Sequence, residues 1–244
     1  MGALFRELLY RPLFNLLVWL YQTVAFEDLG VAIILVTIIV RLILVPLYQK
    51  SIKSQREISL IQPELKEIRE KYKDDKEKQT QEMMSLYQRH KINPLSGIFV
   101  LLIQLPILIA LYRVTLNIFN PDTYPGFYGF VSEPEAINEI AFGFLTVNTS
   151  GNIIMAVLVA LGQFVQTRLI MTRVKNSKPA KKDGESKSDQ EEIAEMVNKQ
   201  MMFVMPLMIG FFAFSLPVGL SIYWITSTIF TVAQEYLLVR RSTN

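Results

Sequence analysis

Five long apolar stretches divide the chain, and charged or loop-forming segments separate most of them. The first, residues 29–49, offers about twenty apolar positions, enough at ~1.5 Å per residue to cross a ~30 Å hydrocarbon core as a helix. The other four are residues 95–115, 152–172, 201–216 and 218–238. The pattern predicts a single-domain, all-α polytopic membrane protein (residues 1–244) with five transmembrane helices.

Residues 3–22 follow a different pattern, in which a narrow polar stripe runs along a leucine-rich helix. The stripe consists of Glu7, Arg11, Asn15 and Gln22. In a sixth span these groups would lie in hydrocarbon, so we favour an amphipathic helix in the plane of the membrane interface. Trp19 and Tyr21 are then expected at headgroup level.

Two segments outside the predicted spans are rich in charge. Residues 50–92 carry both signs, and their apolar residues recur at helical spacing in two runs separated by Asp74 and Asp75, which predicts a helical hairpin. Its charges form a solvated face or a docking surface for a partner. Residues 173–200 are polar and lysine-rich, which indicates a disordered linker.

The distribution of Lys and Arg predicts the orientation. The hairpin, the linker and the carboxyl-terminal tail are basic, whereas the loop at residues 117–150 contains neither Lys nor Arg. Because basic loops stay in the cytoplasm, we expect the hairpin and the carboxyl terminus inside and the amino terminus outside. A model with residues 3–22 inserted also keeps the tail inside, so charge does not decide between five and six spans.

Arg41 lies near the middle of the first predicted span, where a charge costs ~2.5 to 3.5 kcal/mol on insertion scales. No span contains an aspartate, and Glu235 lies at the end of the last one. We therefore expect Arg41 to face a water-containing cavity lined by neutral polar groups, with its charge free for a visiting partner. The alternative is an arginine held by carbonyls or lipid phosphates without a further role.

Neutral polar side chains in the spans could line such a cavity or join helices by hydrogen bonds, and any one of them alone favours the second interpretation. Thr37 lies one turn before Arg41 on the same helix face. The full set is Thr37, Gln104, Gln163, Gln166, Ser215, Ser221, Tyr223, Thr226, Ser227 and Thr228.

Composition agrees with a membrane protein and argues against catalysis. Hydrophobic residues make up 51% of the chain, the net charge is only +3, and there is no cysteine. The single histidine, His90, lies in the hairpin, so no Ser–His pair can form within the membrane. No metal-binding, nucleotide-binding or dinucleotide-binding motif occurs, and the hairpin lacks the aromatic interleaving typical of nucleic-acid binding. We expect neither an enzyme nor a cofactor, a metal site or a specific nucleic-acid partner.

Several motifs, in this order, resemble the YidC/Oxa/Alb membrane protein insertases. They are YRPLFNLLVWLY (10–21), TIIVRLILVPL (37–47), QEMMSLYQRHKINPLSG (81–97), LLIQLPILIALY (101–112) and MPLMIGFFAFSLPVGLSIYW (205–224). The resemblance covers nearly the whole chain. It departs from the Gram-negative pattern in lacking a large extracytoplasmic domain before the Arg41 span, and from the common Gram-positive one in lacking a lipoprotein cysteine.

The resemblance implies an insertase that passes nascent transmembrane segments from the cytoplasm into the lipid bilayer without nucleotide hydrolysis, in a bacterial plasma membrane. It makes the ribosome and the Sec translocon candidate partners. It also implies a groove closed on the outside, in which Arg41 is the groove arginine. Further groove residues, by their match to the family or their position beside such residues, are Thr37, Gln104, Gln163, Gln166, Tyr223 and Trp224.

Two other functions remain open from the residues alone. A small-solute channel or carrier could use Arg41 as an anion site, and solute flux without any nascent chain would favour it. A scaffold for other membrane proteins would co-purify with them without inserting substrates.

Overall fold

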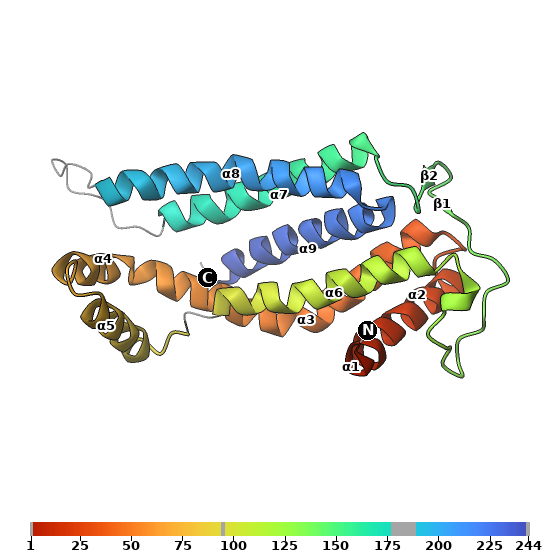
Figure 1. The fold of residues 1–244 in the computed structure, drawn as a ribbon, viewed down its shortest axis with the longest axis horizontal. Helices are drawn as coiled ribbons and strands as arrows, with labels where there is room; N and C mark the ends of the chain where they lie inside the picture. Colours follow the sequence, from red (N-terminus) through yellow and green to blue (C-terminus); the bar gives the residue numbers. More distant parts are fainter. Residues whose placement is uncertain (1, 94–95, 177–188, 243–244) are drawn as a thin grey trace.

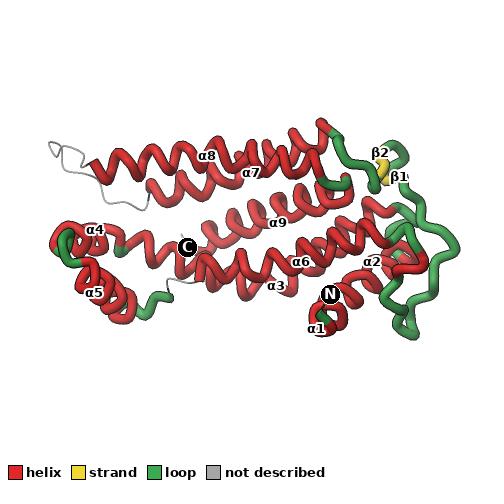
Figure 2. The backbone as a smooth tube through the Cα atoms, viewed as in Figure 1, coloured by secondary structure: helices red, strands yellow, loops and turns green. Residues whose placement is uncertain are grey.

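The computed structural model describes residues 2–93, 96–176 and 189–242, and this part of the chain is mostly helical (Figures 1 and 2). The elements are α1 (Ala3–Phe5), the π-helix η1 (Arg6–Tyr10), α2 (Arg11–Thr23), α3 (Leu29–Leu60), α4 (Gln62–Lys71), α5 (Lys76–Arg89), α6 (Ser96–Asn117), the 3-10 helix η2 (Pro121–Thr123), β1 (Ile140–Ala141), β2 (Leu145–Thr146), α7 (Ile153–Asn176), α8 (Asp189–Ser215) and α9 (Val218–Ser242).

The long helices lie roughly parallel to one long axis. Figure 1 shows α7 and α8 along one edge, α3 and α6 along the other, and α9 between the two pairs, in contact with both α3 and α7. The β1–β2 hairpin and the α2–α3 turn lie at one end of this bundle, and α4 and α5 lie at the other. Helices α3, α6 and α9 therefore lie side by side, and side chains of α2 and α7 also contribute to the buried core.

In the described residues, one helix is long and apolar enough to cross a membrane, at Leu29–Ser54. Shorter apolar stretches occur at Leu102–Asn117, Ile153–Leu169 and Met202–Ser215. Four of the five predicted spans therefore stay predictions.

Two helices are longer than the apolar pattern indicates. Helix α3 continues from the predicted end at residue 49 to Leu60, and α8 begins at Asp189 rather than at residue 201. Both extensions are rich in Lys, Gln, Glu and Arg, which favour helix as strongly as leucine does, so a change of polarity does not end the helix. The linker predicted at 173–200 thus begins and ends in helix, and residues 177–188 lie outside the described residues.

The amino-terminal helix is predicted correctly as a helix, but its polar stripe faces protein. Asn15 is fully buried, donating to Gly126 O (3.0 Å) and accepting from Tyr128 N (2.7 Å). Arg11 and Gln22 also bind loop carbonyls, at 3.3 Å from Gly126 O and 3.0 Å from Ser132 O. Three of the four stripe residues therefore bind the 117–150 loop, whose many backbone groups need partners, whereas Glu7 pairs with Arg11 at 3.1 Å.

Other details of this helix also differ from the expectation. Tyr21 is 4% exposed and accepts a hydrogen bond from Asn138 N (2.9 Å), so it does not contact headgroups, whereas Trp19 is 36% exposed. The π-helix η1 ends at Tyr10, two residues before Pro12. Proline has no N–H for the ordinary bond to the residue four positions back, and such interruptions commonly accompany π turns.

Replacing Asn15 with leucine is expected to lower the free energy of unfolding by about 2 to 4 kcal/mol. The change leaves the buried Tyr128 N–H without its acceptor and places an apolar group against loop carbonyls. Chemical denaturation of the detergent-solubilised protein measures the effect. Gln22→Leu is the matched control, since Gln22 is exposed and makes one loop hydrogen bond. Equal losses in the two variants would contradict the role of Asn15.

The β1–β2 hairpin joins the ends of α3 and α9. Asp28 caps α3 by accepting from Val31 N (3.0 Å), and its other oxygen accepts from Phe142 N (2.6 Å). On the other side, Gly219 N donates to Val147 O at 3.0 Å. Two neighbouring helices are thus fixed at this end by one short antiparallel ladder.

The loop before the hairpin is also packed against the bundle. Phe14 lies 5.0 Å, between ring centroids, from Tyr124. Tyr124 donates from its hydroxyl to Ile118 O (2.9 Å). Burial, with the Glu133 carboxylate as a second cause, raises the pKa of Tyr124 above its usual value. The phenol therefore stays a neutral donor near pH 7.

Helices α4 and α5 form a pair on a small apolar core. Leu65 of α4 is fully buried, and Leu86 of α5 is 2% exposed. Ile61 and Ile92 complete this core. Asp75 caps α5 by accepting from Lys78 N at 2.9 Å, which places the turn at the acidic pair noted in the sequence.

Candidate functional site

Arg41 is buried between α3 and α9, with 8% of its surface exposed. Its Nε donates to Ser227 Oγ at 2.7 Å, and its Nη2 donates to the same oxygen. Its guanidinium carbon lies 4.9 Å from the centroid of the Tyr48 ring. Within the described residues Nη1 has no hydrogen-bond partner, and no carboxylate lies within ion-pair distance of Arg41. The site therefore holds one guanidinium edge in place, and the other edge, at Nη1, is buried without a hydrogen-bond partner among the described residues.

A chain of polar side chains extends from Tyr48 across the bundle. The Tyr48 hydroxyl donates to Gln104 Oε1 at 2.8 Å, and Gln104 Nε2 donates to the Tyr223 hydroxyl. This chain joins α3, α6 and α9, because Gln104 lies on α6 and Tyr223 on α9. Arg41, Gln104 and Tyr223, three of the predicted groove residues, thus belong to one site.

Thr37 is on the predicted face but is already satisfied. It is 1% exposed, and its hydroxyl donates to Ile33 O of its own helix at 2.6 Å. Such a bond between a threonine and the carbonyl four residues earlier is common inside helices. Thr37 therefore supports the wall of the site beside Arg41.

The remaining predicted groove residues lie outside this network. Gln163 Nε2 lies 3.4 Å from Thr167 Oγ1 on its own helix, α7. Gln166 is half-buried on the same helix. Trp224 packs against the small core of Ala156, Val159 and Ala213 between α7 and α8. In the described chain, no hydrogen bond joins these three residues to Arg41.

Two members of the site were not assigned to it from the sequence. Tyr48 lies seven residues after Arg41, which places it on the same helix face two turns away, and this spacing could have identified it. Ser227 was one of many hydroxyls in the last span, and no sequence signal distinguishes it from Thr226 or Thr228. Its role depends on the rotation of α9 against α3, which only packing determines.

Replacing Ser227 with alanine is expected to destabilise the fold by about 2 kcal/mol, because a buried guanidinium loses its acceptor. In a chain of this size that loss lowers Tm by about 4–8 °C. Thr226→Ala is the matched control, since that hydroxyl donates only to Ile222 O of its own helix (2.8 Å). Thermal unfolding in detergent checks both, and a Tm of Ser227→Ala within 1–2 °C of Thr226→Ala would contradict the expectation.

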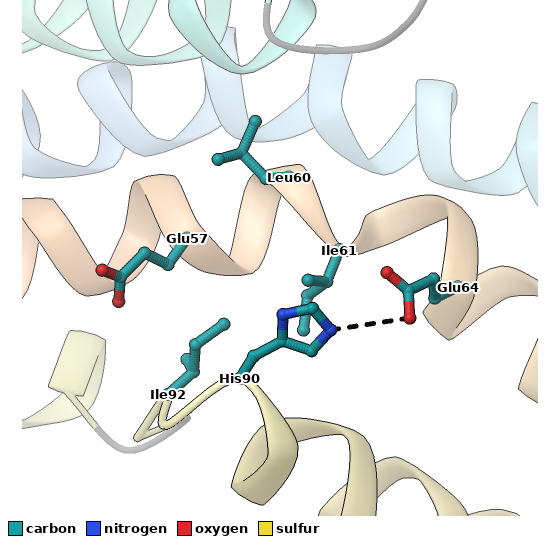
Figure 3. Close-up of a pocket in the computed structure, with 6 residues that line it drawn as sticks. All are labelled: Glu57, Leu60, Ile61, Glu64, His90 and Ile92. Atoms are coloured by element: carbon teal, nitrogen blue, oxygen red, sulfur yellow. Dashed lines mark ion pairs between the residues drawn. The ribbon is translucent and has the colours of Figure 1, made fainter.

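A separate pocket of about 350 Å³ lies at the corner between α3 and α4. Its lining comes from Glu57, Leu60, Ile61, Glu64, His90 and Ile92 (Figure 3). His90 Nε2 lies 3.6 Å from Glu64 Oε2, so the residues after α5 are held against the start of α4. The part of the chain that the structure describes contains no cluster of three or more His, Cys, Asp or Glu residues suited to a metal ion.

Comparison with known proteins decides the family. The family model of the 60Kd inner membrane protein matches residues 19–244. The membrane protein insertase YidC of Oceanobacillus iheyensis is 35% identical over 229 residues, covering 90% of this chain and 79% of that protein. The membrane protein insertase MisCA of Bacillus subtilis is 33% identical over 217 residues, covering 87% and 70%. The chain belongs to the YidC insertase family.

A solved structure agrees with this assignment. An active YidC insertase crystal structure with the first transmembrane domain resolved matches with a TM-score of 0.61 and 28% identity, over 93% of this chain and 46% of that one. YidC of Syntrophobacter fumaroxidans is 32% identical over 232 residues, but the chain spans only 38% of its length. The fold is therefore YidC-like and mostly helical, and the resemblance stated from the motifs is confirmed.

Proposed function

We propose that this chain is a membrane protein insertase that transfers nascent transmembrane segments from the cytoplasm into the bilayer. The observation that carries the proposal is Arg41, a buried guanidinium with an unpaired Nη1 and no ion-paired carboxylate among the described residues. Such a group is costly in a membrane protein unless a partner uses it. Membership of a family whose relatives are named membrane protein insertases supports the same conclusion.

The proposal includes the membrane arrangement drawn from the sequence. Five spans cross the bilayer, residues 3–22 lie at the outer interface, and the α4–α5 pair and the carboxyl terminus lie in the cytoplasm, in a bacterial plasma membrane. The lack of Lys and Arg at 117–150 supports this orientation. The hydrogen bonds of the hairpin to Asp28 and Gly219 support a groove that is closed on the outer side.

The mechanism follows from dielectric physics. The polar segment that flanks a nascent span must cross hydrocarbon, where each bare charge costs several kcal/mol. A hydrated groove that reaches Arg41 shortens this path, and the unpaired donor attracts acidic residues of the moving segment. Burial of the apolar segment in lipid then supplies about 25 cal/mol per Å², so no nucleotide hydrolysis is needed.

Substrates of this insertase are nascent membrane proteins, and the ribosome and the Sec translocon are its proposed partners. Gln163, Gln166 and Trp224 would then contact the moving segment along α7 and α9, at a distance from the Arg41 network. Their half-buried surfaces leave room for such contacts.

Two measurements test the proposal. Proteoliposomes with the purified chain should insert a single-span substrate with an acidic external tail, and protein-free liposomes should not. Single cysteines at positions 41, 166 and 224 should react with a membrane-impermeant thiol reagent from the cytoplasmic side only, since the natural chain has no cysteine. Solute flux without any substrate would instead favour a channel with Arg41 as its anion site, and absence of both activities would favour a scaffold.

A further inference from the structure

A second cavity, of about 370 Å³, opens between α3 and α9. We call it the α3–α9 crevice, and its lining consists of Leu42, Val45, Gln49, Phe230, Ala233, Gln234 and Leu237. Its volume is in the range of ligand pockets. Leu42 and Leu237 are 56% and 61% exposed, so the crevice is open to its surroundings.

The crevice is distinct from the Arg41 site. Helix geometry places Leu42 and Gln49 about 80–100° around α3 from Arg41 and Val45 about 40°, whereas Tyr48 lies about 20° from Arg41 in the opposite direction. The hydrogen-bonded chain through Gln104 therefore leaves from a different side of α3 than the one that lines the crevice.

One buried polar group in the crevice has no partner. Gln234 is 8% exposed, and in the described residues its Nε2 makes no hydrogen bond. A buried amide donor without an acceptor costs about 1–3 kcal/mol, so its burial indicates an acceptor supplied by a bound molecule. The walls beside it are apolar, at Val45, Phe230 and Leu237, so the molecule that carries this acceptor is otherwise apolar.

Along one face of α3 the side chains change from apolar to polar to basic, which matches the order of acyl chain, glycerol ester and phosphate in a phospholipid. Leu42, Val45, Gln49 and Lys53 follow at spacings of three and four residues on one helix face. At ~1.5 Å per residue from Leu29, Val45 lies at about 24 Å, Gln49 at about 30 Å and Lys53 at about 36 Å. In a ~30 Å hydrocarbon core these depths correspond to acyl chain, glycerol ester and phosphate.

Lys53 is available for a phosphate. Its side chain is 80% exposed, and its Nζ lies 4.0 Å from Glu57 Oε1, a surface ion pair of small energy. A lysine at the headgroup level of the cytoplasmic leaflet attracts anionic lipids. A lysine at this level would contribute nothing to the binding of an apolar peptide segment, so it favours a lipid as the occupant.

We propose that the α3–α9 crevice binds one anionic glycerophospholipid of the cytoplasmic leaflet. An ester oxygen accepts from Gln234 Nε2, the acyl chain lies along Val45 and Phe230, and the phosphate pairs with Lys53. The proposal rests on the membrane orientation proposed above.

Native mass spectrometry of the intact chain in detergent tests this proposal with dioleoyl phosphatidylglycerol as the probe. The wild type should retain one lipid, and dioleoyl phosphatidylcholine should be retained about fivefold less. Lys53→Gln should weaken retention of phosphatidylglycerol about fivefold. Lys73→Gln is its matched control, because Lys73 is also exposed but lies in the turn between α4 and α5, away from the crevice.

Two further variants test the crevice itself. Gln234→Met keeps the volume but removes the amide, and should weaken retention roughly fivefold. Ala233→Phe fills the crevice and should abolish retention, whereas Ile229→Phe adds bulk to a side chain that is 63% exposed and lies outside the crevice, and should change nothing. Lys53→Gln is at an exposed site, so it reports on binding even where a crevice variant fails to fold.

Three outcomes would overturn the proposal. They are equal retention of the two lipids, equal retention by Lys53→Gln and Lys73→Gln, and capture of a nascent chain by a photo-crosslinker at position 233 together with unchanged lipid retention in Ala233→Phe. Lipid retention is measured without any substrate, so its failure is distinct from a failure of insertion in proteoliposomes.

Discussion

Insertion of a substrate with an acidic external tail is expected to slow roughly 10- to 100-fold when Arg41 is replaced with alanine. A hydrogen bond to a charged group is worth about 1.5–3 kcal/mol, and Arg41 Nη1 is the donor left available for one. The same substrate with a neutral tail should be affected much less, because its tail gains little from a cation in the groove. Initial rates in proteoliposomes, with protease protection as the readout, measure both effects.

Two controls separate charge from structure. Arg41→Lys keeps the charge but loses the fork that places two N–H groups on Ser227, so an intermediate rate is expected. Arg113→Ala removes an arginine that lies exposed near the end of α6, and its rate should equal that of the wild type. A wild-type rate for Arg41→Ala with the acidic tail would show that the guanidinium does not guide substrates.

Replacement of Gly219 with valine is expected to prevent folding, or to destabilise the fold by at least about 3 kcal/mol. A Cβ at this position would lie 2.7 Å from Thr115 Cγ2 and 2.8 Å from Val147 Cγ1, with Ile33 Cδ1 at 3.3 Å. These neighbours belong to three separate parts of the chain, and each is buried or part of a short ladder. No single side-chain rotation relieves the overlap.

Gly129→Val is the matched control, because a Cβ there would meet no atom within 4 Å. Expression level and the elution profile in detergent compare the two variants. Monodisperse Gly219→Val with a Tm near that of the control would show that the hairpin can move away from α9. The hairpin would then not hold α3 and α9 together at its end of the bundle.

The helical fold and the choice of Arg41 as the main candidate residue were both predicted from the sequence, but for different physical reasons. Apolar length alone indicates a membrane-spanning helix at residues 29–49, and the structure has a helix long and apolar enough to span a membrane at Leu29–Ser54. A charge such as Arg41 in a membrane span costs free energy and has few structural uses, so the sequence indicates a functional role for it. In the structure Arg41 is 8% exposed and donates to Ser227, and the water-filled cavity expected around it stays a prediction.

The partners of Arg41 were less accessible to prediction. Position on α3 points to Tyr48, but the choice of Ser227 depends on how α9 is rotated and shifted along α3. That rotation follows from close approaches such as Gly219 against Thr115, which involve residues far apart in the sequence. Asn15 shows the same limit, because its loop partners lie more than 100 residues away. A polar stripe on a helix looks the same whether it faces water or backbone groups of a loop.

The ladder between β1 and β2 determines which ends of α3 and α9 are held together. It fixes α3 and α9 to each other at one end, through Phe142 and Val147. At their other ends, beyond Tyr48, no backbone hydrogen bond joins the two helices in the described chain. Any separation of α3 from α9 would therefore be largest at the ends farthest from the hairpin. The space opened between the two helices would be a wedge, widest on the side of α4 and α5.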